Sequence, residues 1–312
     1  MRGADAEAVP FVDADALARL LPMLEAIDAL ERAFRDWDPA AGPLRSHVST
    51  PSGTLLLMPA VGEPGVGVKL VTLTDGNPDR GLPLIHALYV LFDPTTQAPR
   101  LLVDGSALTA LRTAAVSGLA TRHLAREDAV RLVIFGAGVQ ARAHLDAMAA
   151  VRKVSDVVIV GRSPSRVNQL VDVAASLGFA ATVGGPDAVN DADIVCTCTT
   201  ATEPLFEGSS LAAGAHINAV GAYQPQTREI DNITVERARV VVETREVAME
   251  EAGDLLIPIG EGTVDAEHIV ADLRQVVQGA TVRSGERDIT LFESVGMAFE
   301  DLAVAGALAA RT

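Results

Sequence analysis

The spacing of apolar residues changes along the chain, and each change predicts a different kind of element. Over residues 13–37, Leu, Ile and Phe recur every three or four positions behind two aspartates that can cap a helix. This pattern predicts one amphipathic helix. From residue 53 to 103, short apolar runs are separated by Pro-Gly, Asp-Gly and Asp-Pro pairs, which predicts an antiparallel sheet. The small and apolar residues of 106–125 then return to helical spacing.

The second half of the chain alternates between strand-like and helix-like segments. RLVIF at 131–135 precedes a turn and a helical stretch, and the same order recurs from residue 154. Short apolar strands follow in ADIVCTCTT, AHINAVGA and ARVVVET. This alternation predicts an α/β fold with a doubly wound parallel sheet of the Rossmann type. We expect the final stretch, 288–312, to form one amphipathic helix, too long to be another strand.

Length and element order together predict two domains. A chain of 312 residues exceeds the usual size of a single domain. We expect the doubly wound domain to span 126–287 and an α+β domain to span 1–125. The C-terminal helix at 288–312 would complete the α+β domain by packing back onto it.

The balance of charges excludes several kinds of partner. The chain has 25 Lys and Arg against 41 Asp and Glu, a net charge of −16, and only 4% of its residues are aromatic. Nucleic-acid binding needs a basic surface and stacking rings, so we expect no nucleic-acid partner. The same charge would repel anionic lipids, and no run reaches the roughly 18 apolar residues of a membrane span. Since the first residues show no secretory signal, we expect a cytoplasmic protein.

The strand at 131–135 leads directly into a glycine-rich turn. Gly136, Gly138 and Ala141 form G-x-G-x-x-A between that strand and a helical stretch. The first glycine permits a tight turn, the second lets the backbone approach a pyrophosphate, and the small third residue lets helix and strand pack. The pattern predicts a dinucleotide site, the alternative being a chance pair of glycines in a turn.

The end of the next strand indicates which dinucleotide binds. A chain that holds NAD usually offers Asp or Glu about 20 residues on, for the ribose. Here Gly161 is followed instead by Arg162, Ser163 and Arg166. Guanidiniums and a hydroxyl suit a dianionic 2′-phosphate, so we prefer NADP(H), with NAD(H) as the alternative. The two arginines would otherwise be solvated residues at a helix start.

Two cations occur where the surrounding residues are apolar. Lys69 interrupts the strand-like run 66–71, and Arg112 lies among leucines and alanines near a helix start. A buried cation is costly unless it meets an anion. That anion is either an internal carboxylate or the α-carboxylate of an amino-acid-like substrate, held by Arg112 as a fork and by Lys69 as a point charge or proton donor. Arg45, just before the sheet, is a weaker third candidate.

The two cysteines are close in sequence. Cys196 and Cys198 would point to one face of a strand, where a disulfide is not expected. No histidine lies near them and no second cysteine pair completes four ligands. We interpret them as packing thiols and expect no metal.

Several segments make the chain resemble the ornithine cyclodeaminase and mu-crystallin family over essentially its whole length. They are LLLMP at 55–59, VKLVT at 68–72, SALTALRTAAVSG at 106–118, VIFGAGVQARAH at 133–144, INAVGAYQPQTREID at 217–231 and TLFESVGMAFED at 290–301. In that family the residues that match Arg45, Lys69 and Arg112 hold the substrate carboxylate. The resemblance also implies a homodimer built through the first domain, which would bind the substrate.

Two positions depart from the ornithine cyclodeaminase pattern. Those enzymes resemble one another in having glutamate where this chain has Leu56 and aspartate where it has Tyr223. Because these acids serve the ornithine amine and the ring closure, their absence weakens the case for ornithine cyclisation. Leu56 and Met58 instead imply an apolar lining, which suits a ring without a terminal ammonium. His86 could face the same cavity as Lys69, but we favour a packed or surface histidine.

We therefore expect an NAD(P)H-dependent oxidoreductase that reduces a small cyclic ketimine or α-imino acid, with Δ1-pyrroline-2-carboxylate as the leading substrate. The alternatives are an ornithine or lysine cyclodeaminase with recycled NAD+, an alanine dehydrogenase, and a mu-crystallin-type protein that binds NADPH and a small carboxylate. Candidate catalytic residues are Lys69, Arg45 and Arg112. Candidate substrate-binding residues are these three with Leu56, Met58, His86 and Tyr223. Candidate cofactor-binding residues are Thr113, Gly136, Ala137, Gly138, Val139, Gln140, Ala141, Gly161, Arg162, Ser163, Arg166, Cys198, Thr199, Val220 and Gly221.

Overall fold

The computed structural model describes residues 8–39, 42–43 and 45–312. These residues divide into two compact units. The first holds the described residues of 1–29, 41–112 and 297–312, and the second those of 30–40 and 113–296. The second unit therefore begins earlier along the helix that follows the sheet, and ends later, than the boundaries expected at 126 and 287.

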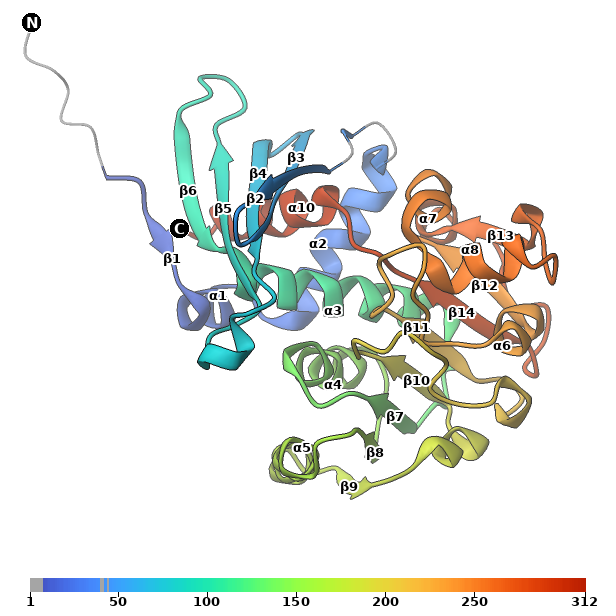
Figure 1. Cartoon of the computed structure of the whole chain (residues 1–312). Coiled ribbons are helices and arrows are strands. Elements are labelled where there is room, and N and C mark those ends of the chain that lie inside the picture. Colours follow the sequence, from blue (N-terminus) through green and yellow to red (C-terminus); the bar gives the residue numbers. More distant parts are fainter. Residues whose placement is uncertain (1–7, 40–41, 44) are drawn as a thin grey trace, which may run out of the picture. The chain divides into compact units, whose positions relative to one another are not determined.

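The first unit is built on a six-stranded sheet in the order β1-β6-β5-β4-β3-β2 (Figure 1). Its neighbouring strands run antiparallel, except that β1 pairs with β6 in parallel. The strands are β1 (Phe11–Val12), β2 (Ser46–Thr50), β3 (Gly53–Gly62), β4 (Gly65–Leu73), β5 (Ile85–Phe92) and β6 (Pro99–Asp104). The antiparallel sheet predicted for 53–103 is confirmed, with β1 and β2 added at its edges.

The two faces of this sheet differ. The inner face carries the buried side chains, among them Met58, Lys69 and Tyr89, which lie opposite one another on β3, β4 and β5. Helix α10 (Ala298–Ala309) packs on β3 and β4 (Figure 1). The outer face carries apolar side chains that remain partly exposed. They are Leu55, Leu57, Val66, Val68, Leu70, Leu88, Val90, Phe92 and Leu102.

Two helix predictions need correction. The helix expected at 13–37 is two helices, α1 (Ala14–Leu20) and α2 (Met23–Asp36). Pro22 lies between them, and proline cannot donate the backbone N–H that a continuous helix requires. Asp13 caps α1, because its side chain accepts a hydrogen bond from the Ala16 N–H at 2.8 Å.

The single C-terminal helix is also wrong. Residues Ile289–Glu293 form β14, and only Ala298–Ala309 form a helix. Between the two elements Gly296 has φ +79°, a left-handed conformation that stops regular structure and favours glycine. The β-branched and aromatic run ITLFE suits a buried strand, and every residue of β14 is buried.

The second unit contains an eight-stranded sheet in the order β13-β12-β14-β11-β10-β7-β8-β9, in which every pairing is parallel. The strands besides β14 are β7 (Arg131–Phe135), β8 (Asp156–Val160), β9 (Ala180–Val183), β10 (Ile194–Thr197), β11 (His216–Ala219), β12 (Ala238–Val242) and β13 (Ile269–Asp272). The predicted doubly wound parallel sheet is confirmed. Chain order reverses between β7 and β10, because β8 and β9 lie to one side of β7 and β10 and β11 to the other.

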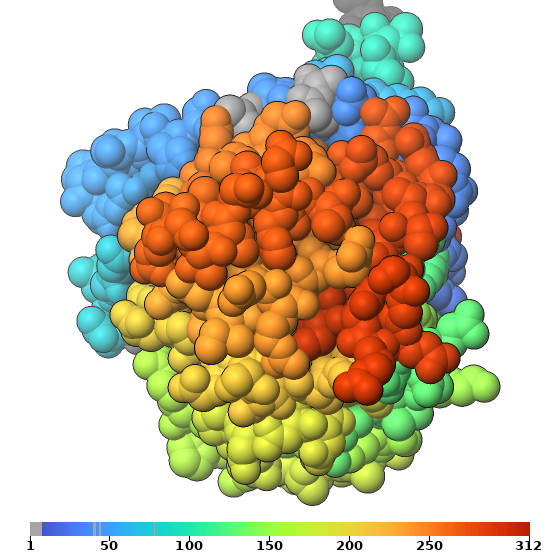
Figure 2. Space-filling model, turned by 90° about the vertical axis from the view of Figure 1, so that its right-hand side faces the viewer, coloured from blue at the N-terminus to red at the C-terminus, as the bar shows by residue number. Residues whose placement is uncertain are grey.

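Helices alternate with these strands. They are α3 (Gly105–Leu124), which enters this unit at Thr113, α4 (Val139–Val151), α5 (Pro164–Ser176), α6 (Asn232–Arg237), α7 (Arg245–Glu251), α8 (Gly253–Gly260) and α9 (Leu273–Val277). Figure 2 shows the orange segment with α7 and α8 at the surface of this unit. The later half of α3 belongs here because Ser117 Oγ lies 3.0 Å from His144 Nε2, and Asn218 Nδ2 donates to Thr121 Oγ1 at 2.9 Å. None of the helices among the described residues is long and apolar enough to cross a membrane.

Candidate active site

The buried cations of the first unit pair with acids on α10. Lys69 Nζ donates to Asp301 Oδ1 at 3.0 Å and lies 2.8 Å from Oδ2. Arg112 Nη1 donates to Glu300 Oε2 at 2.7 Å, and its Nε lies 3.3 Å from Asp301 Oδ1. Lys69 is 1% exposed and Arg112 6%. Internal carboxylates, one of the two anions considered from the sequence, are therefore present beside both cations.

Electrostatics keep the Lys69 proton weakly held. Burial, followed by the positive charge of Arg112, lowers the pKa of Lys69 to about 8, against the opposing effect of Asp301. Arg45 also lowers this pKa, so it acts on the same group of charges. An ammonium with a pKa of about 8 can give up a proton near neutral pH. The arrangement supplies both positive charge and a proton donor.

The lining predicted from Leu56 and Met58 is part of an apolar cluster. Both side chains are buried against Val71, and Leu73, Ala87 and Ala298 pack beside them half-buried. Met58 lies directly opposite Lys69 on the neighbouring strand, so the cluster adjoins the cation on the inner face. His86 pairs with Thr72 and so lies exposed on the outer face, as in the surface alternative, and not on the face of Lys69.

In the second unit the glycine-rich turn has the backbone shape that a pyrophosphate needs. Gly136 has φ +113°, and a Cβ there would lie 2.4 Å from the Cys198 carbonyl oxygen, so only glycine fits. Gly138 is the N-cap of α4, where nothing lies within 4 Å of a would-be Cβ and no side chain caps the helix. The first N–H groups of α4 and the open space before them suit an anion. Ala137, Val139, Gln140 and Ala141 complete this turn.

The end of β8 carries the predicted basic residues on its surface. Arg162 and Arg166 are exposed, Gly161 is exposed beside them, and Ser163 is the N-cap of α5. The Ser163 side chain makes no capping bond and lies 3.3 Å from Ser165 Oγ. Exposed cations fit the solvated alternative and also remain available to a phosphate.

The loops that follow β10 and β11 lie at the carboxyl edge of the sheet, next to the point where chain order reverses. Cys198 and Thr199 follow β10, and Val220 and Gly221 follow β11. Ligands of doubly wound sheets bind at this edge and this point. Tyr223, in the same loop as Gly221, is 40% exposed. Both cysteines are free.

Glu229 is not among the candidate residues predicted from the sequence, yet the structure places it between two of the loops that hold candidates. Its carboxylate accepts hydrogen bonds from the Thr199 N–H and the Gly221 N–H, each at 2.8 Å, and from Thr199 Oγ1 at 2.5 Å. Glu229 thus joins the loop after β10 to the loop after β11. The partners Glu300 and Asp301 were also missed, although they lie within the quoted segment 290–301.

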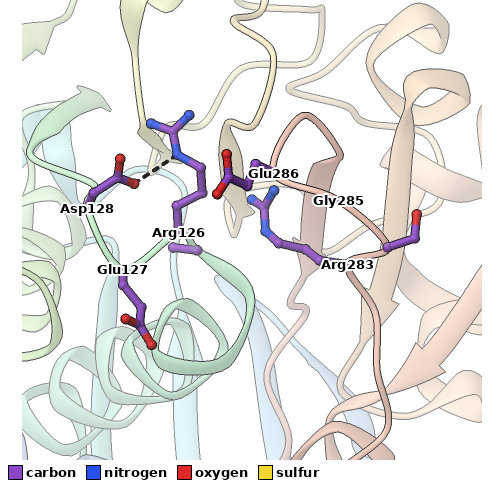
Figure 3. A pocket seen from close by; sticks show the side chains of 8 residues that line it. Arg126, Glu127, Asp128, Arg283, Gly285 and Glu286 are labelled. Atoms are coloured by element: carbon purple, nitrogen blue, oxygen red, sulfur yellow. Dashed lines mark hydrogen bonds and ion pairs between the residues drawn. The ribbon is translucent and has the colours of Figure 1, made fainter.

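A cavity of about 660 Å³ lies at the amino edge of the same sheet, lined by residues 125–128 and 283–286 (Figure 3). Arg126 pairs there with Asp128 at 3.2 Å, and its Nη2 donates to Asp193 at 2.5 Å. Arg283 bonds to backbone carbonyls. Because its cations are occupied and it lies at the edge opposite the glycine-rich turn, this cavity is not the dinucleotide site.

The fold and these residues define a two-unit α/β protein with a dinucleotide-binding turn and a buried lysine–arginine group. The model of the ornithine cyclodeaminase/mu-crystallin family matches residues 11–311, and the chain belongs to that family. The resemblance seen in the sequence is confirmed.

Relatives of the chain include named reductases. It is 35% identical over 305 residues to a Δ1-pyrroline-2-carboxylate reductase of Bacillus cereus, with 94% of each chain covered. It is 37% identical over 256 residues to the ketimine reductase mu-crystallin of Rattus norvegicus, covering 81% of this chain and 79% of that one. Among solved structures, the Δ1-pyrroline-2-carboxylate reductase of Thermococcus litoralis, in complex with NADH and L-proline, matches with TM-score 0.91, 36% identity and 96% of each chain covered.

Proposed function

We propose that this protein is an NAD(P)H-dependent reductase that converts a small cyclic ketimine, of the Δ1-pyrroline-2-carboxylate class, into the cyclic amino acid. The observation that carries the proposal is the buried Lys69–Arg112 pair beside the apolar cluster of Leu56, Met58 and Val71. A cyclic imino acid presents one carboxylate, one basic nitrogen and an apolar ring. The relatives named as reductases of such imines support the same substrate class.

The carboxylate would be held by Arg112, Lys69 and Arg45. Glu300 and Asp301 orient the first two side chains from behind, which fixes the cations before the substrate arrives. The named groups comprise three positive charges and two negative ones, which leaves this group able to accept one more anion. The absence of an acid at Leu56 and Tyr223 disfavours a diamino acid such as ornithine.

Lys69 would hold the proton that the reaction consumes. A bound, reduced nicotinamide dinucleotide supplies the hydride, which adds to the imine carbon. The C=N double bond becomes a single bond, and its electron pair goes to nitrogen, which takes a proton from Lys69 Nζ. Burial, the positive charge of Arg112 and the opposing carboxylate of Asp301 set the pKa of Lys69 and so how readily that proton leaves.

The cofactor would lie with its pyrophosphate at the glycine-rich turn, as the Gly136 conformation and the open space at Gly138 support. We propose that Thr113 of α3 also contacts the cofactor. We propose NADP(H) over NAD(H), because Arg162, Ser163 and Arg166 stand where an acid would hold a free ribose hydroxyl.

The first unit would also form a homodimer. The outer face of its sheet presents nine partly exposed apolar side chains, Leu55 to Leu102 as given above. A contiguous apolar surface of this kind marks an interaction site. Leu57→Lys with Val68→Glu on this face should yield monomers in light scattering, whereas an unchanged mass for this variant, or a monomeric unmodified protein, would refute the dimer.

The test of the function is a substrate panel with NADPH and NADH. Δ1-Pyrroline-2-carboxylate and its six-membered homologue should oxidise the cofactor, whereas pyruvate with ammonia or methylamine should be poor substrates. Faster turnover of pyruvate with ammonia would favour an alanine dehydrogenase. Ammonia released from ornithine would favour a cyclodeaminase, and saturable NADPH binding without oxidation of any imine would favour a binding protein.

A further inference from the structure

We propose that Glu229 is a positioning residue for the nicotinamide end of the cofactor: it fixes the loops after β10 and β11 in one shape. This inference rests on the proposed function for the identity of the cofactor. The Glu229 side chain is fully buried, and its carboxylate accepts hydrogen bonds from Thr199 and Gly221, two of the proposed cofactor-binding residues.

The bonds are arranged as a bridge. Oε1 accepts from the Thr199 N–H and hydroxyl, and Oε2 accepts from the Gly221 N–H. Each carboxylate oxygen therefore serves a different loop. Since β10 and β11 are neighbouring parallel strands, one carboxylate spans the gap between their carboxyl ends. No uncharged side chain of the same size could accept on both oxygens.

Gly221 shows how closely the bridge is packed. A Cβ at this position would lie 2.5 Å from Glu229 Oε2 and 2.3 Å from the Thr199 carbonyl oxygen. Any larger residue would push the two loops apart. The glycine is thus required by Glu229 and Thr199 rather than by its own backbone angles.

The backbone of Glu229 is anchored by a second buried acid. Asp254, at the start of α8, accepts hydrogen bonds from the Glu229 N–H at 2.8 Å and the Ile230 N–H at 2.9 Å through Oδ1. Gly253 lies so close to residues 224 and 227 that a Cβ would meet their carbonyl oxygens at 2.4 and 2.0 Å. The segment before Glu229 is therefore anchored on α8, and Glu229 has a rigid base from which to reach the loops.

The location of the two loops gives the bridge its function. Chain order reverses between β7 and β10, and ligands of doubly wound sheets bind at such a point. One of the two loops follows β10 itself, and the other follows its neighbour β11. The pyrophosphate would lie at the neighbouring turn after β7, and the 2′-phosphate at the end of β8. The loops after β10 and β11 are on the side of β7 away from β8. We therefore assign them to the nicotinamide end of the dinucleotide.

The test uses Glu229→Gln, whose amide keeps one acceptor oxygen but points its NH₂ group at a backbone N–H of one loop. Asp231→Asn is the matched control. Asp231 lies two residues away and likewise accepts backbone N–H groups, from Thr234 at 2.8 Å and Gly208 at 2.9 Å, but these bonds reach neither Thr199 nor Gly221. Thr199→Val, which removes the hydroxyl's bond to Glu229 and the bond that this hydroxyl accepts from the Ala201 N–H at 2.9 Å, serves if Glu229→Gln does not fold.

Binding is measured for NADPH, by its fluorescence, and for 2′-phospho-ADP-ribose, which lacks the nicotinamide. We expect Glu229→Gln to weaken NADPH binding about 10- to 100-fold and the fragment less than about twofold, as follows from losing one or two bonds to a charged acceptor. Thr199→Val should weaken NADPH alone about 3- to 10-fold, and Asp231→Asn neither ligand.

Equal weakening of NADPH and the fragment by Glu229→Gln, or no weakening by a folded Glu229→Gln or Thr199→Val, would overturn the positioning role. The unmodified protein separates this outcome from failure of the proposed function. If it binds NADPH but reduces no ketimine, the reductase proposal fails and the binding comparison still decides the role of Glu229. If the unmodified protein binds neither NADPH nor NADH, both proposals are wrong.

Discussion

The two units bury charge in opposite ways. In the first unit, buried cations face buried acids, as Lys69 faces Asp301 and Arg112 faces Glu300. In the second unit, Glu229 and Asp254 are buried and accept hydrogen bonds from backbone N–H groups. Burial raises the pKa of both acids, and for Asp254 the charge of Glu229 adds to the effect.

The difference shows what each arrangement can do. Paired charges can rearrange when an anion binds. Lys69 or Arg112 could give up a contact with a protein carboxylate and make one with the substrate carboxylate instead. An acid satisfied by backbone donors fixes the chain that carries those donors. The first arrangement suits substrate binding and proton transfer, and the second suits the shaping of loops. The following experiments test the roles assigned to the two arrangements.

The largest effect is expected from breaking the cation side. Arg112→Met should lower kcat/KM for the ketimine about 30-fold to several thousand-fold, through loss of the carboxylate fork. It should also destabilise the fold by about 3–5 kcal/mol, because Glu300 is left buried and uncompensated. Urea unfolding and steady-state kinetics measure the two losses separately.

Adding Glu300→Gln to Arg112→Met separates the two roles. The double variant should regain most of the stability, since the uncompensated acid is gone, and should stay catalytically impaired. Recovery of activity together with stability would show that Arg112 serves only the fold.

A smaller effect is expected from the exposed cations of the second unit. Arg162→Ala should weaken NADPH by about 1.5–3 kcal/mol and leave NADH almost unchanged, because only the phosphate loses a charged partner. Isothermal titration with both cofactors measures this difference. Tighter binding of NADH than NADPH by the unmodified protein would reverse the cofactor preference.

The pH dependence of catalysis tests the Lys69 proton. Burial and Arg112 lower the pKa of Lys69 to about 8, so kcat/KM for reduction should fall about tenfold per pH unit above that value. Oxidation of the amino acid needs the neutral amine and should rise through the same pH. In Lys69→Arg the side chain stays protonated, so a profile for this variant that still bends near pH 8 would assign the titration to another group.

The last experiment concerns stability and Asp254. Burial and Glu229 raise the pKa of Asp254 to about 8. Between its ordinary value near 3.8 and 8, the folded protein therefore binds more protons than the unfolded chain. Stability should then decrease as pH rises through this window, and Asp254→Asn should flatten the decrease. Thermal unfolding between pH 5 and 8 would show an unchanged slope if Asp254 were ionised throughout.

The fold could be predicted from the sequence where the spacing of apolar residues was typical of a strand or of a helix alone. The prediction was wrong where both spacings occurred in one segment. The parallel sheet and the glycine-rich turn follow from short apolar strands and from a glycine pair in strand–turn–helix context. In the segment 289–309 apolar residues recur every three or four positions through the strand, the connection and the helix, so this spacing predicted one helix. The break comes from Gly296, whose positive φ depends on its surroundings.

The candidate site was predicted in part for a related reason. A cation in an apolar run is visible in the sequence, so Lys69 and Arg112 could be found. Their partners lie 232 and 188 positions away, and no local pattern links them. The bridge made by Glu229 was equally hidden, because its role depends on which strands are neighbours. The face of the sheet on which His86 lies could not be decided from the sequence, because the register of β4 and β5 determines it.

The most direct measurement of the central claim follows the hydride itself. NADPH carrying deuterium at C4, prepared separately on each face of the ring, is incubated with Δ1-pyrroline-2-carboxylate, and the proline formed is examined by NMR and mass spectrometry. We expect one proline per NADPH oxidised, with deuterium at Cα from one of the two labelled cofactors. Proline without deuterium from either cofactor, or no NADPH oxidation, would contradict it.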